Sequence, residues 1–272
     1  MPAQAIAMNF EFVCATDTGR LRDNNEDAVV VDPQTGVVVL ADGMGGYNAG
    51  EVASGMATSL ICTQLGRWLS EASPSSTDSD VRRTMDACVD NANRAIFEQS
   101  NANPQCAGMG TTLVVGVFRD GRLLIGHVGD SRAYRLRAGV LQQITHDHSL
   151  LQEQIDAGLI TEEQAAFSAN KNLVTRAVGV EETVLLETKL HEMQSDDLYL
   201  ICSDGLSDMI SDELIQRLLQ TTDSLESIGA GLINAANEAG GRDNISVILV
   251  RSRGEGAAGA APSRSWWPFR RG

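Results

Sequence analysis

The sequence contains very little lysine. Lys171 and Lys189 are the only lysines in 272 residues, and the formal net charge is -15. Proteins that bind nucleic acid or anionic membranes in general neutralise phosphates with clustered Lys and Arg. We therefore expect no nucleic-acid partner, although composition alone does not select a substrate.

Paired cysteines and long apolar runs are also missing. The five cysteines are widely spaced and include no Cys-x-x-Cys pair, so neither a disulfide framework nor a thiolate zinc site is predicted. No segment approaches the ~18 consecutive apolar residues that span a bilayer. The N-terminus lacks the charged start and apolar stretch of a secretion signal. We expect a soluble protein in a reducing cytoplasm, and a monomer.

The length fits one large domain followed by a tail. We predict an N-terminal extension over residues 1–9, a folded domain over 10–252 and a disordered tail over 253–272, where Gly, Ala, Ser and Pro dominate. Trp266 and Trp267 close to the end could anchor at a membrane interface or on a partner protein. A tail without function explains them equally well.

The apolar patterns predict a mixed order of strands and helices. The segments 113–118 and 122–128 form a hairpin around Asp120-Gly121, and a second hairpin turns at Ala138-Gly139. The segment 149–166 predicts two short helices linked by Gly158. Helices are expected over 50–69, 80–99 and about 225–236, and further strands over 10–15, 28–31, 36–41, 198–203 and 245–250. This order is typical of an α+β domain in which helices cover antiparallel sheets.

Two of the three longer helices have a clear apolar face. Val81, Met85, Val89 and Ile96 mark one side of the second helix, and Leu225, Ile228 and Leu232 one side of the third. In the first helix we assign the apolar stripe to Val52, Met56, Leu60 and Leu65, with close packing through Ala53, Gly55 and Ala57.

Two apolar runs end on an Asp-Gly pair, at Asp42-Gly43 and at Asp204-Gly205. An ionised Asp at the end of a buried strand is costly to desolvate unless a positive group pairs with it. Neither run carries Lys or Arg beside its Asp, so a divalent cation is the simplest partner. A single Asp-Gly pair alone would indicate only a turn.

Two further acids have comparable settings. Asp130 follows the apolar run 123–128, and Asp243 precedes the run 245–250. Carboxylate and carbonyl oxygens are hard ligands that suit Mg²⁺ or Mn²⁺. Four such Asp predict one oxygen-rich centre, and two ions sharing a carboxylate would favour hydrolytic phosphoryl chemistry.

The residues also match a known family. The chain resembles the metal-dependent protein phosphatases of the PPM (PP2C-like) family over about residues 10–250, and within it the compact bacterial serine/threonine phosphatases that reverse eukaryotic-like kinases. The motifs that carry the resemblance are, in order, 17-DTGRLRDNNED-27, 42-DGMGG-46, 110-GTT-112, 129-GDSR-132, 203-SDGLSD-208 and 242-RDNIS-246. The resemblance implies a four-layer α-β-β-α sandwich of two antiparallel sheets flanked by helices, with a flap over about 146–180.

The resemblance also implies roles for the acidic residues. Asp42 would bridge two core ions, the Gly43 carbonyl would bind one of them, and Asp204 and Asp243 would complete the other site. Glu26 would act through water, with Asp27 in support. A weaker third ion would be held by Asp130, Asp204 and Asp208.

Arg22 corresponds to the arginine that grips the substrate phosphate, for which its planar fork is suited. Its neighbour Arg20 is expected to be a solvated surface charge. A metal-bridging hydroxide would attack phosphorus in line, without a phosphoenzyme.

The chain departs from the usual residues of the family at two places, one near the leaving group and one in the flap. Met44 stands where some relatives carry a His that protonates the leaving oxygen. Here the proton must come from metal-bound water or from another acid. His127, His146 and His148 are candidates by residue type, although a structural hydrogen bond is the preferred interpretation of each. The segment 167–172 lacks the usual His-Pro of the flap, which affects substrate access and the third ion.

Three functions follow from the resemblance. The favoured one is a Mn²⁺- or Mg²⁺-dependent hydrolase of phosphoserine and phosphothreonine in proteins, opposing a cognate bacterial Ser/Thr kinase. The second is a catalytically weak module that binds phosphoproteins. The third is a phosphatase of sigma-factor regulators, for which the sequence offers no appended sensor domain.

Overall fold

The computed structural model describes residues 8–46, 49–73, 75–165 and 173–254. Residues 255–272 of the predicted tail, with Trp266 and Trp267, and the flap segment 167–172 lie outside these residues. Residues 8–9 and 253–254, predicted to lie in the extension and the tail, instead belong to the first and last strands. No helix within the described ranges is long and apolar enough to cross a membrane.

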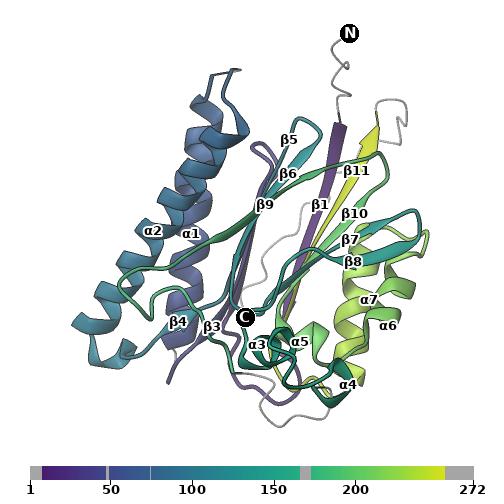
Figure 1. Ribbon diagram of the computed structural model, residues 1–272. Coiled ribbons are helices and arrows are strands. Elements are labelled where there is room, and N and C mark those ends of the chain that lie inside the picture. Colours follow the sequence, from purple (N-terminus) through teal and green to yellow (C-terminus); the bar gives the residue numbers. More distant parts are fainter. Residues whose placement is uncertain (1–7, 47–48, 74, 166–172, 255–272) are drawn as a thin grey trace, which may run out of the picture.

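Two antiparallel sheets form the centre of the fold (Figure 1). One sheet has the order β1 (Met8–Asp17), β11 (Ile245–Gly254), β10 (Leu198–Cys202), β7 (Arg132–Arg137) and β8 (Val140–Gln143). The other has the order β2 (Asp27–Asp32), β3 (Val37–Met44), β5 (Leu113–Arg119), β6 (Arg122–Val128) and β9 (Glu187–Glu192), and β4 (Gly110–Thr111) pairs with β3.

Long helices cover both outer faces. The second sheet is covered by α1 (Ala49–Glu71) and α2 (Asp78–Ala102), and the first by α6 (Asp212–Leu219) and α7 (Leu225–Glu238) (Figure 1). Three short elements, α3 (Leu150–Asp156), α4 (Glu162–Ala165) and α5 (Asp204–Ser207), lie together at one end of the sandwich, and a 3-10 turn spans Pro104–Cys106. The predicted four-layer sandwich is confirmed.

Three separate cores explain the layers. One core joins α1 and α2 to their sheet, one joins α6 and α7 to theirs, and the third fills the space between the sheets around Val38, Tyr199 and Ile248. Phe118 packs edge-on against Tyr199 with ring centroids 5.4 Å apart. Strands that face two cores are buried on both sides, which is why 37–41 and 198–202 are almost continuously apolar.

Helix α1 follows its prediction in part. Ala53 and Ala57, predicted to pack closely, are fully buried together with Leu65, and Met56 and Leu60 are partly buried against the same core. Small side chains let this helix approach β3 closely. The prediction is wrong at Val52, which is exposed, and at Gly55, which has open space around it. The predicted faces of α2 and α7 are buried as expected.

Candidate metal centre

Asp42 is held by β3 at a fixed register. Its strand pairs with β2 so that Asp42 lies opposite Asp27. The Asp42 backbone N–H donates to Thr112 Oγ1 at 3.1 Å, and the Thr112 N–H donates to the Asp42 carbonyl at 2.9 Å. These bonds occupy the backbone of Asp42 and leave its carboxyl to face the pocket described below.

Gly43 lies where three segments meet. Its N–H donates to the Glu26 carbonyl at 3.1 Å. A Cβ on Gly43 would come within 2.1 Å of the Gly50 carbonyl oxygen, and a Cβ on Gly50 within 2.8 Å of Glu26 Oε2. Two residues without side chains therefore allow the start of α1 to pack on β3 and bring the Glu26 carboxyl beside it.

The four Asp predicted to converge do so. Asp42, Asp130, Asp204 and Asp243 line one pocket of about 240 Å³, although they come from four different segments of the chain. The described lining also includes Arg22, Glu26, Gly43, Met44, Gly45, Thr112 and Val174.

The carboxyl groups of this pocket disfavour one another's ionisation. Burial, reinforced by the charges of neighbouring Asp residues, raises the pKa of Asp42 and of Asp204 well above the usual value. Burial likewise raises the pKa of Asp130 to about 6, with Asp147 as the next cause. So many acids in one buried place are costly unless cations share the site.

The donor set fits a hard divalent cation. Asp204 Oδ1 and Asp27 Oδ1 are buried and have no hydrogen-bond partner in the part of the chain that the structure describes, and unpaired buried carboxylate oxygens are rare in native structures. Every predicted ligand offers oxygen, which suits Mg²⁺ or Mn²⁺ better than Zn²⁺.

Asp27 and Asp208 are both absent from the described lining of this pocket. Asp27 is buried, pairs with Asp42 across the two strands and accepts a hydrogen bond from Ser203 Oγ at 2.8 Å. Burial raises the pKa of Asp27 to about 6. Asp208 instead lines an adjoining cavity of about 450 Å³, which shares Asp130 and Asp204 with the central pocket.

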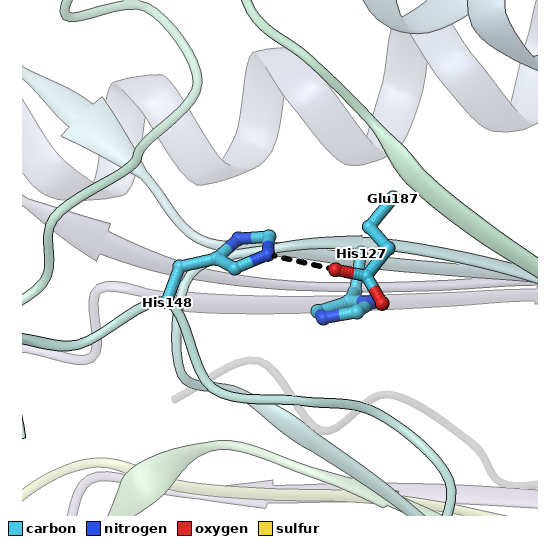
Figure 2. Close-up of side chains that lie close together, drawn as sticks. All are labelled: His127, His148 and Glu187. Carbon is cyan, nitrogen blue, oxygen red and sulfur yellow. Dashed lines mark hydrogen bonds and ion pairs between the residues drawn. The ribbon is translucent and has the colours of Figure 1, made fainter. Parts of the chain in front are cut away.

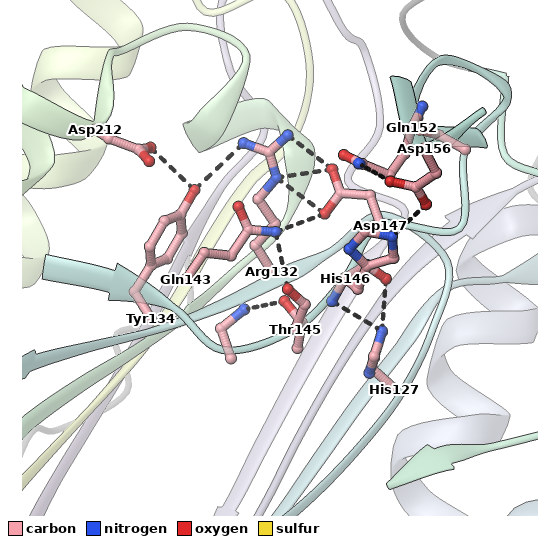
Figure 3. Close-up of polar contacts among 12 residues, drawn as sticks. His127, Arg132, Tyr134, Gln143, Thr145, His146, Asp147, Gln152, Asp156 and Asp212 are labelled. Atoms are coloured by element: carbon pink, nitrogen blue, oxygen red, sulfur yellow. Dashed lines mark hydrogen bonds and ion pairs between the residues drawn. The ribbon is translucent and has the colours of Figure 1, made fainter. Parts of the chain in front are cut away.

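A polar network supports the wall of the adjoining cavity (Figure 3). The Arg132 guanidinium donates through Nη2 to Asp147 Oδ2 at 2.7 Å and through Nη1 to the Tyr134 hydroxyl at 3.3 Å. That hydroxyl donates to Asp212 at 3.1 Å. Because Arg132 follows Asp130 by two positions, these bonds orient the loop that carries Asp130.

Arg22 lines the central pocket but already has a partner. Its Nη2 donates to Asp243 Oδ2 at 2.7 Å, and about half of the Arg22 side chain is exposed. Arg20 is exposed and is absent from the lining. The structure therefore brings the predicted phosphate ligand and a predicted metal ligand into one ion pair.

The three histidines lie outside the pocket lining. His146 Nε2 makes a 2.7 Å contact with exposed Asp156, whereas His127 and His148 are 2% and 5% exposed and stack with ring centroids 4.8 Å apart. None of the three is therefore placed to protonate a leaving group at Asp42.

His127, His148 and Glu187 form a compact cluster (Figure 2). His148 Nδ1 accepts from the Gly129 N–H at 3.2 Å, so the proton of a neutral ring lies on Nε2, which donates to Glu187 at 3.4 Å. His127 Nε2 contacts the His146 carbonyl at 2.7 Å and is its donor. His148 turns a protonated nitrogen toward Glu187. We therefore interpret the cluster as a set of hydrogen bonds that hold the segment 146–148 against β6 and β9, and not as a metal site.

Several residues that shape the pocket had no predicted role. The Thr112 hydroxyl holds the Asp42 backbone, Gly50 lets α1 pack on Gly43 outside the lining, and Val174 lines the pocket from the flap. The Gly110-Thr111-Thr112 motif was a usable signal for Thr112. Nothing in the sequence pattern singled out Gly50 or Val174.

Comparisons with known proteins agree with this geometry. Residues 20–249 match the family model described as protein phosphatase 2C. The chain is 38% identical over 247 residues to the serine/threonine phosphatase stp of Listeria monocytogenes serotype 4b, covering 89% of this chain and 95% of that protein. It is 39% identical over 245 residues to the serine/threonine protein phosphatase PstP of Mycobacterium tuberculosis H37Rv, covering 90% of this chain and 45% of that protein.

Solved structures show the same fold. The Mycobacterium tuberculosis phosphatase PstP/Ppp superposes with a TM-score of 0.80 at 38% identity, covering 89% of this chain and 98% of that one. The catalytic domain of PstP in complex with 2 manganese ions gives a TM-score of 0.79 at 36% identity, covering 91% and 100%. With this fold, this acidic pocket and a family match over most of its length, the chain belongs to the protein phosphatase 2C (PPM) family of metal-dependent serine/threonine protein phosphatases.

Proposed function

We propose that the protein releases phosphate from phosphoserine and phosphothreonine in proteins, using Mn²⁺ or Mg²⁺ in the pocket around Asp42. The observation that carries the proposal is the convergence of Asp42, Asp130, Asp204 and Asp243 on one pocket, in which Asp204 Oδ1 has no hydrogen-bond partner among the described residues. The manganese ions in the related PstP structure support the choice of metal.

The proposed ligands divide by position. Asp42 lies centrally and would contact two core ions, with the Gly43 carbonyl and Glu26 on one side and Asp204 and Asp243 on the other. When bound, such ions lower the pKa of coordinated water and neutralise charge on phosphoryl oxygens. A weaker third ion would lie toward the adjoining cavity, where Asp130, Asp204 and Asp208 meet.

Arg22 would bind and orient the phosphoryl group. Its guanidinium lines the same pocket as Asp42 and can present two N–H groups to two phosphoryl oxygens. The described lining contains no Cys, Ser or His, and its Thr112 hydroxyl already bonds the Asp42 N–H and the Ser131 hydroxyl. Its Asp carboxylates are the proposed metal ligands. Direct transfer of the phosphoryl group to water is therefore the proposed course, with the leaving oxygen taking its proton from solvent at this half-open site.

The proposed partners follow from the reaction. A hydrolase of protein phosphoserine and phosphothreonine needs a kinase that forms these esters, and we propose a bacterial Ser/Thr kinase as its counterpart. Action as a monomer in the reducing cytoplasm is consistent with five cysteines that are all free.

The test is Mn²⁺-dependent release of phosphate from a phosphothreonine peptide. The wild type is expected to turn over the peptide, and Asp204→Ala is expected to be inactive while keeping its fold by circular dichroism. If both proteins are inert yet bind the peptide equally well, the chain is a phosphoprotein-binding module and the proposed reaction is wrong.

A further inference from the structure

A second groove opens beside the metal pocket and has no role in the proposed chemistry. It measures about 550 Å³, and its wall is largely aliphatic, with Met44, Val174, Val180, Val184 and Leu185 in the lining. Val180 and Leu185 are 52% and 74% exposed. Large apolar side chains gathered around a groove and left in contact with water commonly mark a binding surface.

The segment that forms this wall is held rigidly. Thr111 and Val178 exchange two backbone hydrogen bonds of 3.0 and 2.8 Å. Asn93, 1% exposed on α2, accepts from the Gly179 N–H at 2.7 Å and donates to the carbonyls of Glu181 and Glu182 at 3.0 and 3.1 Å. The exposed aliphatic side chains thus project from a fixed backbone, so a ligand would meet a preformed surface.

Two glycines let the segment that forms this wall pack closely against the rest of the domain. A Cβ on Gly110 would lie 2.6 Å from Val180 Cγ2, and a Cβ on Gly179 would lie 2.1 Å from Ile96 Cγ2. These two glycines let the segment sit directly on β4 and on α2. Its remaining apolar surface therefore faces outward, into the groove.

The groove is continuous with the metal pocket. Met44 and Val174 line both, so a chain whose phosphorylated residue reaches Asp42 would pass along the groove. The charged residues of the lining, Arg176 and Glu181, carry opposite signs, and neither makes an ion pair with a described residue. Their charges cancel, which favours an uncharged occupant over a basic or acidic one.

We propose that this groove seats a large aliphatic side chain of the protein substrate, a few residues from the phosphorylated serine or threonine. The proposal rests on the proposed function, because the groove gains this role only if the phosphoryl group is bound beside Met44. It assigns substrate selection to Val180, Val184 and Leu185, which lie outside the metal centre.

The test uses phosphothreonine peptides that carry one leucine in an otherwise Gly/Ser sequence. Leucine is moved through roughly four positions on each side of the phosphothreonine, since an extended chain advances about 3.3–3.6 Å per residue. Alanine replaces leucine in matched peptides. Para-nitrophenyl phosphate, which has no flanking residue, reports on the metal centre alone.

Leucine at one or two positions is expected to raise kcat/KM about tenfold over alanine. In Leu185→Ser and Val180→Ser this preference is expected to shrink to about twofold or less, measured as the ratio of leucine to alanine peptide. Val140→Ser, which removes a side chain of intermediate exposure (66%) at the start of β8, far from the groove lining in sequence, should keep the wild-type ratio.

Equal rates for all peptides in the wild type, or an unchanged preference in both groove variants, would overturn the proposal. A wild type that forms a dimer by light scattering, and that becomes monomeric in Leu185→Ser, would overturn it too by showing that a second copy covers the groove. Absence of turnover with every substrate, para-nitrophenyl phosphate included, would instead count against the proposed function.

Discussion

Arg22 Nη2 lies 2.7 Å from Asp243 Oδ2, so one charge-assisted bond joins the predicted phosphate ligand to a predicted metal ligand. A cation that binds Asp243 competes with the guanidinium for this carboxylate. Metal loading would thereby release Arg22 toward the pocket, where its donors can face a phosphoryl group. If Asp243 is a metal ligand as proposed, metal binding and the availability of Arg22 for the substrate are coupled through this pair.

Replacing Arg22 tests the coupling. Arg22→Ala is expected to raise KM for a phosphothreonine peptide roughly tenfold, with a smaller change in kcat, because phosphate capture is lost. Its affinity for Mn²⁺ should equal or exceed that of the wild type, because the competitor for Asp243 is gone. Titration calorimetry with Mn²⁺ and steady-state kinetics measure the two effects.

Arg20→Ala is the matched control, since it removes an exposed arginine two positions away that does not line the pocket. It should leave both KM and Mn²⁺ affinity at wild-type values. A lower Mn²⁺ affinity in Arg22→Ala would show that the ion pair supports the metal site and does not compete with it.

Replacing Asp42 should separate activity from stability. Asp42→Asn is expected to lower kcat/KM roughly a thousandfold, because the carboxylate proposed to contact both core ions is lost. In the presence of a chelator the same variant should melt at a higher temperature than the wild type, since it removes a buried acid whose pKa is raised by burial and by its Asp neighbours. Phosphate release and thermal denaturation check the two parts, and a variant that is both active and less stable would refute the assignment.

The stability of the metal-free protein should depend on pH in a defined direction. Burial raises the pKa of Asp27 and of Asp130 from 3.8 to about 6. The folded state therefore binds protons more tightly than the unfolded state, so the contribution of these groups to stability is full below about pH 4 and is lost as the pH rises through about 6. Urea denaturation in chelator, compared at about pH 5 and about pH 7.5, measures this change.

Asp130→Asn should weaken this pH dependence, whereas Asp120→Asn, at an exposed hairpin turn, should not alter it. Adding Mn²⁺ should reverse the trend, because protons and metal compete for the same oxygens. A pH profile in chelator that is identical in wild type and Asp130→Asn would contradict the prediction.

Asn93 is expected to be a strong determinant of local stability. Asn93→Ala leaves one buried N–H and two carbonyls without their partner, which costs about 2–3 kcal/mol of the free energy of unfolding. Limited proteolysis should then cut first within residues 178–185. Asn91→Ala, which loses only an exposed contact with Gln64, is the control and should change stability by less than about 0.5 kcal/mol.

The sequence predicts best those elements whose large apolar residues fall on one face. The stripes on α2 and α7 are buried as predicted, and the predicted close packing of α1 holds at Ala53 and Ala57. It fails at Val52 and Gly55, which do not face the core. Strand β9 was not predicted, since it is a polar edge strand whose pairing depends on β6. Helix α6 was missed because only Ile215 and Leu219 of its eight residues are buried.

The residues of the acidic pocket also divide into those that a local pattern predicts and those that depend on contacts between distant segments. Asp42, Asp130, Asp204 and Asp243 were predictable together because each stands next to a core strand. Gly50 and Val174 contribute through contacts between distant segments, which no local pattern contains. The pairing of Arg22 with Asp243 also joins residues far apart in the chain. The roles of these residues in catalysis stay predictions.

Strand β1 lies at a sheet edge, where its partner is β11, so Met8 pairs with Gly254 and Asp17 with Ile245. During synthesis on the ribosome, the first strand emerges long before the last one exists to receive it. Asp243, two residues before β11, emerges equally late. A nascent chain that has not yet been extended through β11 therefore cannot assemble the acidic pocket, and synthesis of this strand sets the earliest moment at which the pocket can receive a metal ion.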